Sequence, residues 1–229
     1  MAKKKKTSTS KEDKSNIIRN LIFFSGIVLF AYLYMRYKIS PTQSVEPITE
    51  QLVLNRTWNN YYQEVDSIAK EFELSTPYLL ALIVLECSGK KEIEPRFEAH
   101  IYKELKRARD TKDRFGSMSY KKIKHCNNTD LQNLATSWGP FQLMGYQSIE
   151  MDVRLEDIKG SHSVYWGCYW IYKRYGKYLK KDELTNAFHI HNTGRPAPKN
   201  GVFETHNPNY IKNGLAYYAY FKQRIKEAE

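Results

Sequence analysis

An uninterrupted apolar segment, YLLALIVL (Tyr78–Leu85), is followed directly by a glutamate, Glu86. Pro77 before this segment is typical of the first turn of a helix, and Gly89 after it is typical of a helix end. A helix that is apolar on every face lies in the interior of a folded domain. The segment therefore predicts a central buried helix, capped by Thr76, with one carboxyl group in its last turn.

The remaining sequence predicts further helices around this one. Apolar residues recur at helical spacing in the ranges 58–72, 97–110, 129–135, 161–179, 182–192 and 207–229. No alternating stretch with an Asn-Gly or Asp-Gly turn indicates an extended sheet. We therefore expect a mainly α domain with at most a short β-hairpin.

Basic residues gather at the N-terminus. Residues 1–38 contain nine Lys/Arg and two Asp/Glu, whereas the rest of the chain carries a net charge of only +4. The charge is thus a property of the tail, and no nucleic-acid-binding motif accompanies it, so we expect no nucleic-acid partner. Within 17–38, the uncharged stretch NLIFFSGIVLFAYLYM, together with Ile17, Ile18 and a snorkelling Arg19, reaches about twenty residues, which is just long enough to cross a bilayer. The lysines before it predict a cytoplasmic N-terminus.

The apolar stretch near the N-terminus has two interpretations, an uncleaved signal anchor and a cleaved signal peptide. No small-residue cleavage site follows it, which favours the anchor. The predicted parts are a cytoplasmic basic tail (1–16), a transmembrane signal anchor (17–38), a linker (39–57) and a folded domain (58–229). The folded domain would then face outward from the membrane.

Cysteine and histidine spacing gives little sign of a metal site. Cys87, Cys126 and Cys168 allow one disulfide in three pairings, or three unpaired thiols packed as small apolar side chains. His189 and His191 are two residues apart, a spacing that turns their side chains away from one another on a helix. We therefore expect neither a metal nor a cofactor.

Glu86 is the first candidate for chemistry. Desolvation and the negative end of the helix dipole both favour a neutral carboxylic acid over a carboxylate at such a position. A carboxylic acid that keeps its proton can protonate the leaving oxygen of a glycosidic bond. The alternative is a structural glutamate that turns outward into solvent where the helix ends.

A second candidate stretch is ATSWGPFQLMGYQ (135–147). It combines the polar side chains of Ser137 and Gln142 with the apolar side chains of Phe141 and Met144. Amides bond hydroxyl and acetamido groups, and flat apolar surfaces receive sugar rings, so this mixture suits a carbohydrate. The alternative is a turn in the core, which would explain Phe141 and Met144 better than Gln142.

Four motifs in this order resemble the N-acetylmuramidase family of bacteria and phages. This family belongs to the lysozyme-like superfamily, with the goose-type lysozymes and the lytic transglycosylases. The resemblance covers about residues 60–222 and rests on Glu86 with Ser88-Gly89, Phe97-Glu98-Ala99-His100, the segment 137–145, and Asn192-Thr193-Gly194. Cys87 is a departure, because it separates Glu86 from the Ser-Gly pair and puts a sugar contact of Ser88 in doubt. The resemblance implies a lysozyme-like α+β fold with two helical lobes around the buried helix.

The resemblance also implies an activity, cleavage of the β-1,4 bond between N-acetylmuramic acid and N-acetylglucosamine in peptidoglycan. Glu86 takes the position of the catalytic acid, and no cofactor is implied. The residues implied in substrate binding are Ser137, Gln142, Met144, Asn192 and Tyr210, of which the last supports the acid in the transglycosylase branch. The domain would act at the inner membrane of a bacterium, in the periplasm or outside.

The type of product stays open at the level of sequence. Hydrolysis usually needs a second carboxylate, for which Glu98 is the natural candidate and Asp152 a weaker one. A lytic transglycosylase needs only Glu86 and leaves 1,6-anhydromuramoyl ends. Two further alternatives are a catalytically inactive wall-binding module of an envelope-spanning secretion, conjugation or phage-derived machinery, and a membrane scaffold for partner proteins. A glutamate retained at the acid position argues against the inactive module, and the polar loops around Ser137 and Asn192 argue against the scaffold.

Overall fold

A computed structural model describes residues 49–228 of the 229-residue chain. The expected tail (1–16), the expected anchor (17–38) and most of the expected linker lie outside the described residues. Within 49–228, no helix combines the length and the apolar character needed to cross a membrane.

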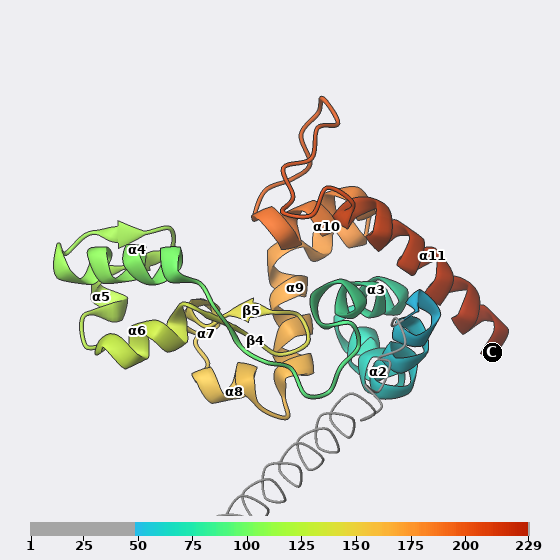
Figure 1. The fold of residues 1–229 in the computed structure, drawn as a ribbon, viewed down its shortest axis with the longest axis horizontal. Coiled ribbons are helices and arrows are strands. Elements are labelled where there is room, and N and C mark those ends of the chain that lie inside the picture. Colours follow the sequence, from blue (N-terminus) through green and yellow to red (C-terminus); the bar gives the residue numbers. More distant parts are fainter. Residues whose placement is uncertain (1–48, 229) are drawn as a thin grey trace, which may run out of the picture. The chain divides into compact units, whose positions relative to one another are not determined.

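The described chain is mainly helical, as expected from the sequence (Figure 1). Its helices are α2 (Glu50–Phe72), α3 (Thr76–Cys87), α4 (Ala99–Asp110), α5 (Tyr120–Ile123), α6 (Asn128–Leu134), α7 (Tyr146–Met151), α8 (Leu155–Lys159), α9 (Ser163–Leu179), α10 (Leu184–Thr193) and α11 (Tyr210–Ala228). Its strands are β1 (Arg96–Phe97), β2 (Arg114–Phe115), β3 (Met118–Ser119), β4 (Thr136–Trp138) and β5 (Leu143–Met144).

The strands form more sheet than the single hairpin expected from the sequence. Strands β1, β4 and β5 make an antiparallel sheet, in which Ser137 lies opposite both Arg96 and Met144. Strands β2 and β3 pair separately. Each strand is two or three residues long, too short to display the alternation of polar and apolar residues that reveals a strand in a sequence.

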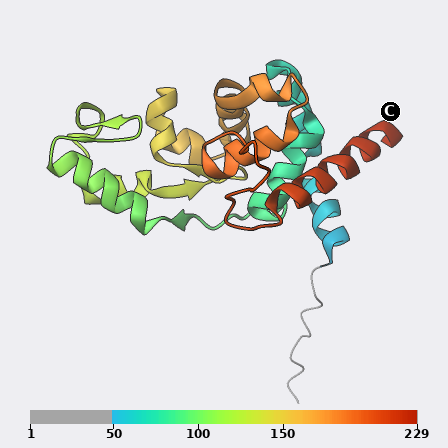
Figure 2. The ribbon, with the colours of Figure 1, turned by 90° about the horizontal axis from the view of Figure 1, so that it is seen from above.

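Helix α3 is the buried helix predicted from the apolar segment. All side chains from Tyr78 to Val84 are buried, and α2 and α11 pack along the helix (Figures 1 and 2). A helix with no polar face needs such cover on several sides.

The ends of α3 differ slightly from the prediction. The N-cap is Ser75 rather than Thr76, because the Thr76 hydroxyl instead donates a hydrogen bond to Asp66 Oδ1 on α2, at 3.0 Å. The helix ends at Cys87, and Ser88 adopts the left-handed conformation with φ of 53°. Glu86 therefore lies in the last turn, as predicted.

The folded domain begins earlier than the sequence suggested. Helix α2 starts at Glu50, where the Thr49 side chain accepts a hydrogen bond from Leu52 N at 3.3 Å. Residues 50–57 were expected to be linker, but they are helical, and Leu54 and Thr57 in this range are buried. The buried Leu54 holds this part of the chain in the core.

The described residues contain two separate hydrophobic clusters. The larger surrounds α3 and includes side chains of α2, α9, α10 and α11. The smaller is formed by α4, α5, α6 and β3, with Leu105, Met118 and Leu131 at its centre. Strands β4 and β5 lie between the two groups of helices (Figure 1). Residues from the helices of both clusters can therefore line a cleft beside this sheet.

Candidate functional site

Glu86 does not turn outward at the end of α3. Its side chain is only 16% exposed. Its Oε1 accepts a hydrogen bond of 2.5 Å from the hydroxyl of Tyr210, the buried first residue of α11. The carboxyl group is therefore held in place by a residue 124 positions away in the sequence.

Helix α2 fixes the backbone directly after the acid. Three successive carbonyl groups accept hydrogen bonds from its side chains: Ser88 from Arg56, Gly89 from Asn60 and Lys90 from Tyr61. All are between 2.6 and 2.9 Å long. These bonds leave the carbonyl of Ser88 fully engaged with Arg56 and hold the end of α3 in one position.

His191 lies beside the acid, with its Nε2 at 3.8 Å from Glu86 Oε1. The same Nε2 is 3.0 Å from the carbonyl oxygen of Phe141, and because a carbonyl can only accept, this nitrogen carries the proton. Nδ1 then accepts from the Tyr175 hydroxyl at 2.8 Å, which accepts in turn from Tyr78 at 3.1 Å. A buried chain of polar groups thus runs from the core to Glu86.

Burial sets the charge of these groups. Desolvation lowers the pKa of His191, against the opposing effect of the Glu86 charge, so the imidazole is neutral at neutral pH. Desolvation raises the pKa of Tyr210 well above its usual value, and the nearby Glu86 raises it further. The Tyr210 phenol therefore keeps its proton and remains a hydrogen-bond donor to Glu86.

Two cavities meet at Glu86. One has a volume of about 380 Å³ and is lined by both glutamates and four of the other predicted residues: Glu86, Glu98, Ser137, Gln142, Met144 and Asn192. The other has a volume of about 1020 Å³ and is lined by α2 and the segment after α3. Because Glu86 and Gln142 line both, the acid lies at the junction of the two cavities.

Gln142 is held by its own turn. Its Oε1 accepts from the Ser137 hydroxyl at 2.8 Å, and its Nε2 donates to the carbonyl of Gly139 at 3.1 Å. Its φ of 50° lies in the left-handed region, which costs a residue with a Cβ roughly 1–2 kcal/mol. The second hydrogen of the amide has no acceptor among residues 49–228 and is left for a ligand.

Glu98 lies at the N-cap position of α4, at the start of a helix as predicted. Its side chain does not cap the helix but pairs with Arg96 at 2.7 Å, and His100 Nδ1 lies 3.7 Å away. This ion pair gives Glu98 a structural role, yet Glu98 also lines the same cavity as Glu86. Asp152 is the C-cap of α7 and lines neither cavity.

The three cysteines are unpaired, so none of the three disulfide pairings is formed. Burial raises the pKa of Cys87 to about 11, and its thiol donates to the carbonyl of Ile83 at 3.3 Å. A thiol that keeps its proton at neutral pH is a poor nucleophile. Cys87 is therefore a packing residue next to Glu86.

Within residues 49–228, no three His, Cys, Asp or Glu side chains gather as a metal ion would require. His189 does not join His191 at the cavity, because its Nδ1 lies 2.7 Å from the carbonyl of Arg195. The role of His191 beside Glu86 was not predicted. Its contacts with Phe141 and Tyr175 join separate helices and loops, and no local pattern in the sequence indicates them.

No family model, no curated protein and no solved structure matches this chain. Its function is therefore inferred from the residues around Glu86 and from the motifs in the sequence.

Proposed function

We propose that the protein cleaves the β-1,4 bond between N-acetylmuramic acid and N-acetylglucosamine in peptidoglycan, with Glu86 as general acid. The observation that carries the proposal is the position of Glu86, a mostly buried carboxyl group at the junction of two cavities. A linear glycan can occupy both cavities and present one internal glycosidic bond to the acid. An internal bond of a polymer is the bond that a muramidase cleaves.

The hydrogen bonding of Glu86 suits proton donation. Tyr210 and His191 both lie against Oε1, and within residues 49–228 no hydrogen bond is made to Oε2. Oε2 can therefore carry the proton to the leaving oxygen, while Tyr210 fixes the orientation of the carboxyl group. After the bond breaks, the Tyr210 hydroxyl stabilises the carboxylate that remains.

The rest of the cleft suits a sugar polymer. Polar groups of Gln142 and Asn192 lie in the same cavity as the apolar side chains of Met144 and Trp170. Sugars with acetamido groups are bound by such mixtures of amides and flat apolar surfaces. The resemblance to the N-acetylmuramidase family rests partly on the motifs that contain these residues, and it favours the same substrate.

Incubation of the protein with purified peptidoglycan sacculi, followed by mass analysis of the released fragments, tests the proposal. Release of disaccharide fragments with reducing muramic acid ends is the expected result. Fragments with 1,6-anhydromuramoyl ends would show that the protein catalyses the transglycosylase reaction instead of hydrolysis. Binding to sacculi without release of fragments would contradict the enzymatic function and indicate a wall-binding module.

Glu98 distinguishes hydrolysis from transglycosylation. If it stabilises the oxocarbenium-like transition state or activates water, Glu98→Gln lowers the turnover of sacculi by at least ~10²-fold, as expected for a lost catalytic carboxylate. The matched control is Glu104→Gln, which removes another arginine-paired carboxylate of the same region at a side chain 44% exposed. Unchanged turnover in Glu98→Gln would leave Glu86 as the sole carboxylate and favour the transglycosylase.

Tyr210→Phe tests the support of the acid. The ring and its packing remain, but Glu86 loses the hydrogen bond that orients its carboxyl group and that becomes charge-assisted when the proton leaves, worth roughly 1.5–3 kcal/mol in that state. We expect kcat/KM on sacculi to fall at least ~10-fold while the far-ultraviolet circular dichroism is unchanged. Tyr218→Phe on the same helix is the control, because no hydrogen bond of its hydroxyl is formed within 49–228. Equal activity of the two variants would remove Tyr210 from the mechanism.

A further inference from the structure

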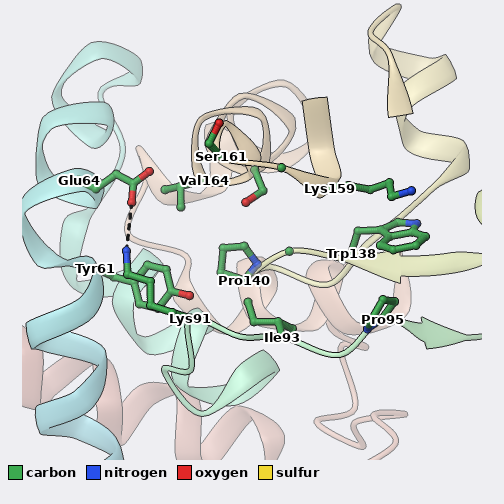
Figure 3. Close-up of a pocket in the computed structure, with 13 residues that line it drawn as sticks. Tyr61, Glu64, Lys91, Ile93, Pro95, Trp138, Pro140, Lys159, Ser161 and Val164 are labelled. Atoms are coloured by element: carbon green, nitrogen blue, oxygen red, sulfur yellow. Dashed lines mark ion pairs between the residues drawn. The ribbon is translucent and has the colours of Figure 1, made fainter. Parts of the chain in front are cut away.

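A further cavity, of about 410 Å³, opens between α2, the segment 91–95, the turn 138–140 and the start of α9 (Figure 3). None of the proposed catalytic residues lines it. It shares Lys91, Ile93 and Pro95 with the larger of the two cavities at Glu86. The segment 91–95 is therefore a wall common to the proposed glycan cleft and this pocket.

Two ammonium groups border the pocket, and aromatic rings hold both of them. Lys159 Nζ lies 4.4 Å from the centre of the Trp138 ring, and Lys91 Nζ lies 4.9 Å from the centre of the Tyr61 ring. A cation–π contact orients a cation without neutralising it. Within residues 49–228, Lys159 pairs with no carboxylate, whereas Lys91 forms an ion pair of 3.9 Å with Glu64, whose carboxylate also lines the pocket (Figure 3). Two ammonium groups against one carboxylate leave a net positive charge at the pocket. The pocket therefore offers positive charge to a ligand.

Hydrogen-bond donors lie on the wall that also carries Lys159, across the pocket from Lys91 (Figure 3). The hydroxyls of Ser161 and Ser163 line the pocket and form no hydrogen bond with residues 49–228. Ser163 and Val164 begin α9, a helix of 17 residues whose N-cap residue, His162, provides no side-chain cap. The N–H group of Ser163 already donates to the carbonyl of Gly160, at 3.0 Å, whereas the N–H groups that follow it in the first turn have no acceptor within the helix and carry partial positive charge. These groups and the two lysines all favour an anion.

The remaining walls decide what kind of anion fits. Ile93, Pro95, Pro140 and the ring of Trp138 give the pocket an apolar surface. A small inorganic anion gains nothing from such walls, whereas a carboxylate carried on a peptide can place its carbon atoms against them. The volume also exceeds what one small ion requires.

We infer that this pocket binds the carboxylates of the short acidic peptide attached to the muramoyl residue of the substrate, an inference that rests on the proposed function. The peptide branches from the sugar, so a glycan bound in the cleft presents it at the side of the strand. The shared wall 91–95 is where such a branch can leave the cleft and enter the pocket. The enzyme would then prefer glycan that still carries its peptides.

Lys159→Gln is the variant that tests the pocket alone, because Lys159 is exposed and lines neither cavity at Glu86. Lys177→Gln is the matched control, since Lys177 also lies over an aromatic ring, that of Tyr178 at 5.2 Å, but lines none of the three cavities. Cleavage is measured on glycan strands with peptides and on strands from which an amidase has removed them. Binding is measured by calorimetry with the tripeptide N-acetyl-L-alanyl-γ-D-glutamyl-diaminopimelate and, separately, with inorganic phosphate.

We expect the unaltered protein to show a kcat/KM at least ~5-fold higher on peptide-bearing strands, since a charge-assisted contact contributes a factor of that order. Lys159→Gln should lose this preference and bind the tripeptide ~5-fold more weakly, with unchanged cleavage of bare strands, while Lys177→Gln behaves as the unaltered protein.

Equal cleavage of both substrates by the unaltered protein, or equal tripeptide affinity in Lys159→Gln, would overturn the inference. Phosphate bound as tightly as the tripeptide would overturn it as well, because the pocket would then be a general anion site. Failure to cleave either glycan, with tripeptide binding that still depends on Lys159, would contradict the proposed activity but support the peptide pocket. The two hypotheses therefore fail separately.

Discussion

Replacing Glu86 by glutamine is expected to lower the cleavage of peptidoglycan at least ~10²-fold, the scale of a lost general acid. The amide has nearly the same shape as the carboxyl group, so no cavity opens beside Tyr210, which still finds an oxygen acceptor. The amide cannot give up a proton to a leaving oxygen. Turnover is measured from the disaccharide fragments released from purified sacculi.

A matched control separates this effect from a change of charge in the cleft. Glu94→Gln removes another carboxylate that lines the larger cavity at Glu86, and its turnover should stay close to that of the unaltered protein. Sacculus binding and circular dichroism of Glu86→Gln should also be unchanged. Near-normal turnover in Glu86→Gln would show that Glu86 is not the acid and would remove the basis of the proposed function.

Replacing Gly89 by alanine is expected to destabilise the fold by about 3 kcal/mol, which combines backbone strain with overlap in a packed site. Gly89 has a φ of 69°, and a Cβ atom there would lie 2.1 Å from Thr57 Oγ1 and 2.8 Å from the Thr57 Cα atom. Backbone atoms of α2 cannot rotate away, so α2 and the end of α3 must separate. The midpoint of urea unfolding measures the loss.

Gly116→Ala is the control for the strain alone. Gly116 also has a positive φ, of 54°, but no atom lies within 4 Å of the position that its Cβ would take. Gly116→Ala should lower the free energy of unfolding by only roughly 1–2 kcal/mol, the typical penalty of the left-handed conformation. If the two alanine variants were equally stable, the contact between Gly89 and α2 would not hold the end of α3.

The central helix was predictable from the sequence because its signal is local. Eight consecutive apolar residues from Tyr78, with Pro77 before them, leave few alternatives to a buried helix, and the structure buries the first seven of them. The position of Glu86 in the last turn follows from the same segment. Ser75 replaced Thr76 as the cap because Asp66, on another helix, engages the Thr76 hydroxyl. The sequence of residues 76–89 does not indicate this contact, because Asp66 lies on a different helix.

The surroundings of the acid were only partly predictable. Glu98, Gln142 and Asn192, which the motifs singled out, line one cavity with Glu86. His191 was considered only as a metal ligand, and its actual neighbours, Phe141 and Tyr175, come from distant parts of the chain. The early start of α2 was not predictable either. The burial of its first turns depends on packing against other helices, and residues 50–57 show no clear helical periodicity in the sequence.

The hydrogen bond between Glu86 and Tyr210 has a consequence for the order of events during protein synthesis. The ribosome must add 124 more residues after the acid before its hydrogen-bond donor exists. Until α11 emerges, one side of α3 also lacks its cover. A nascent or truncated chain therefore contains Glu86 without its hydrogen bond to Tyr210. The proposed ability to cleave a polymer would arise only when synthesis of the chain is nearly complete. If the proposed cleavage of peptidoglycan is correct, such a delay separates synthesis of the protein from its activity on the cell wall.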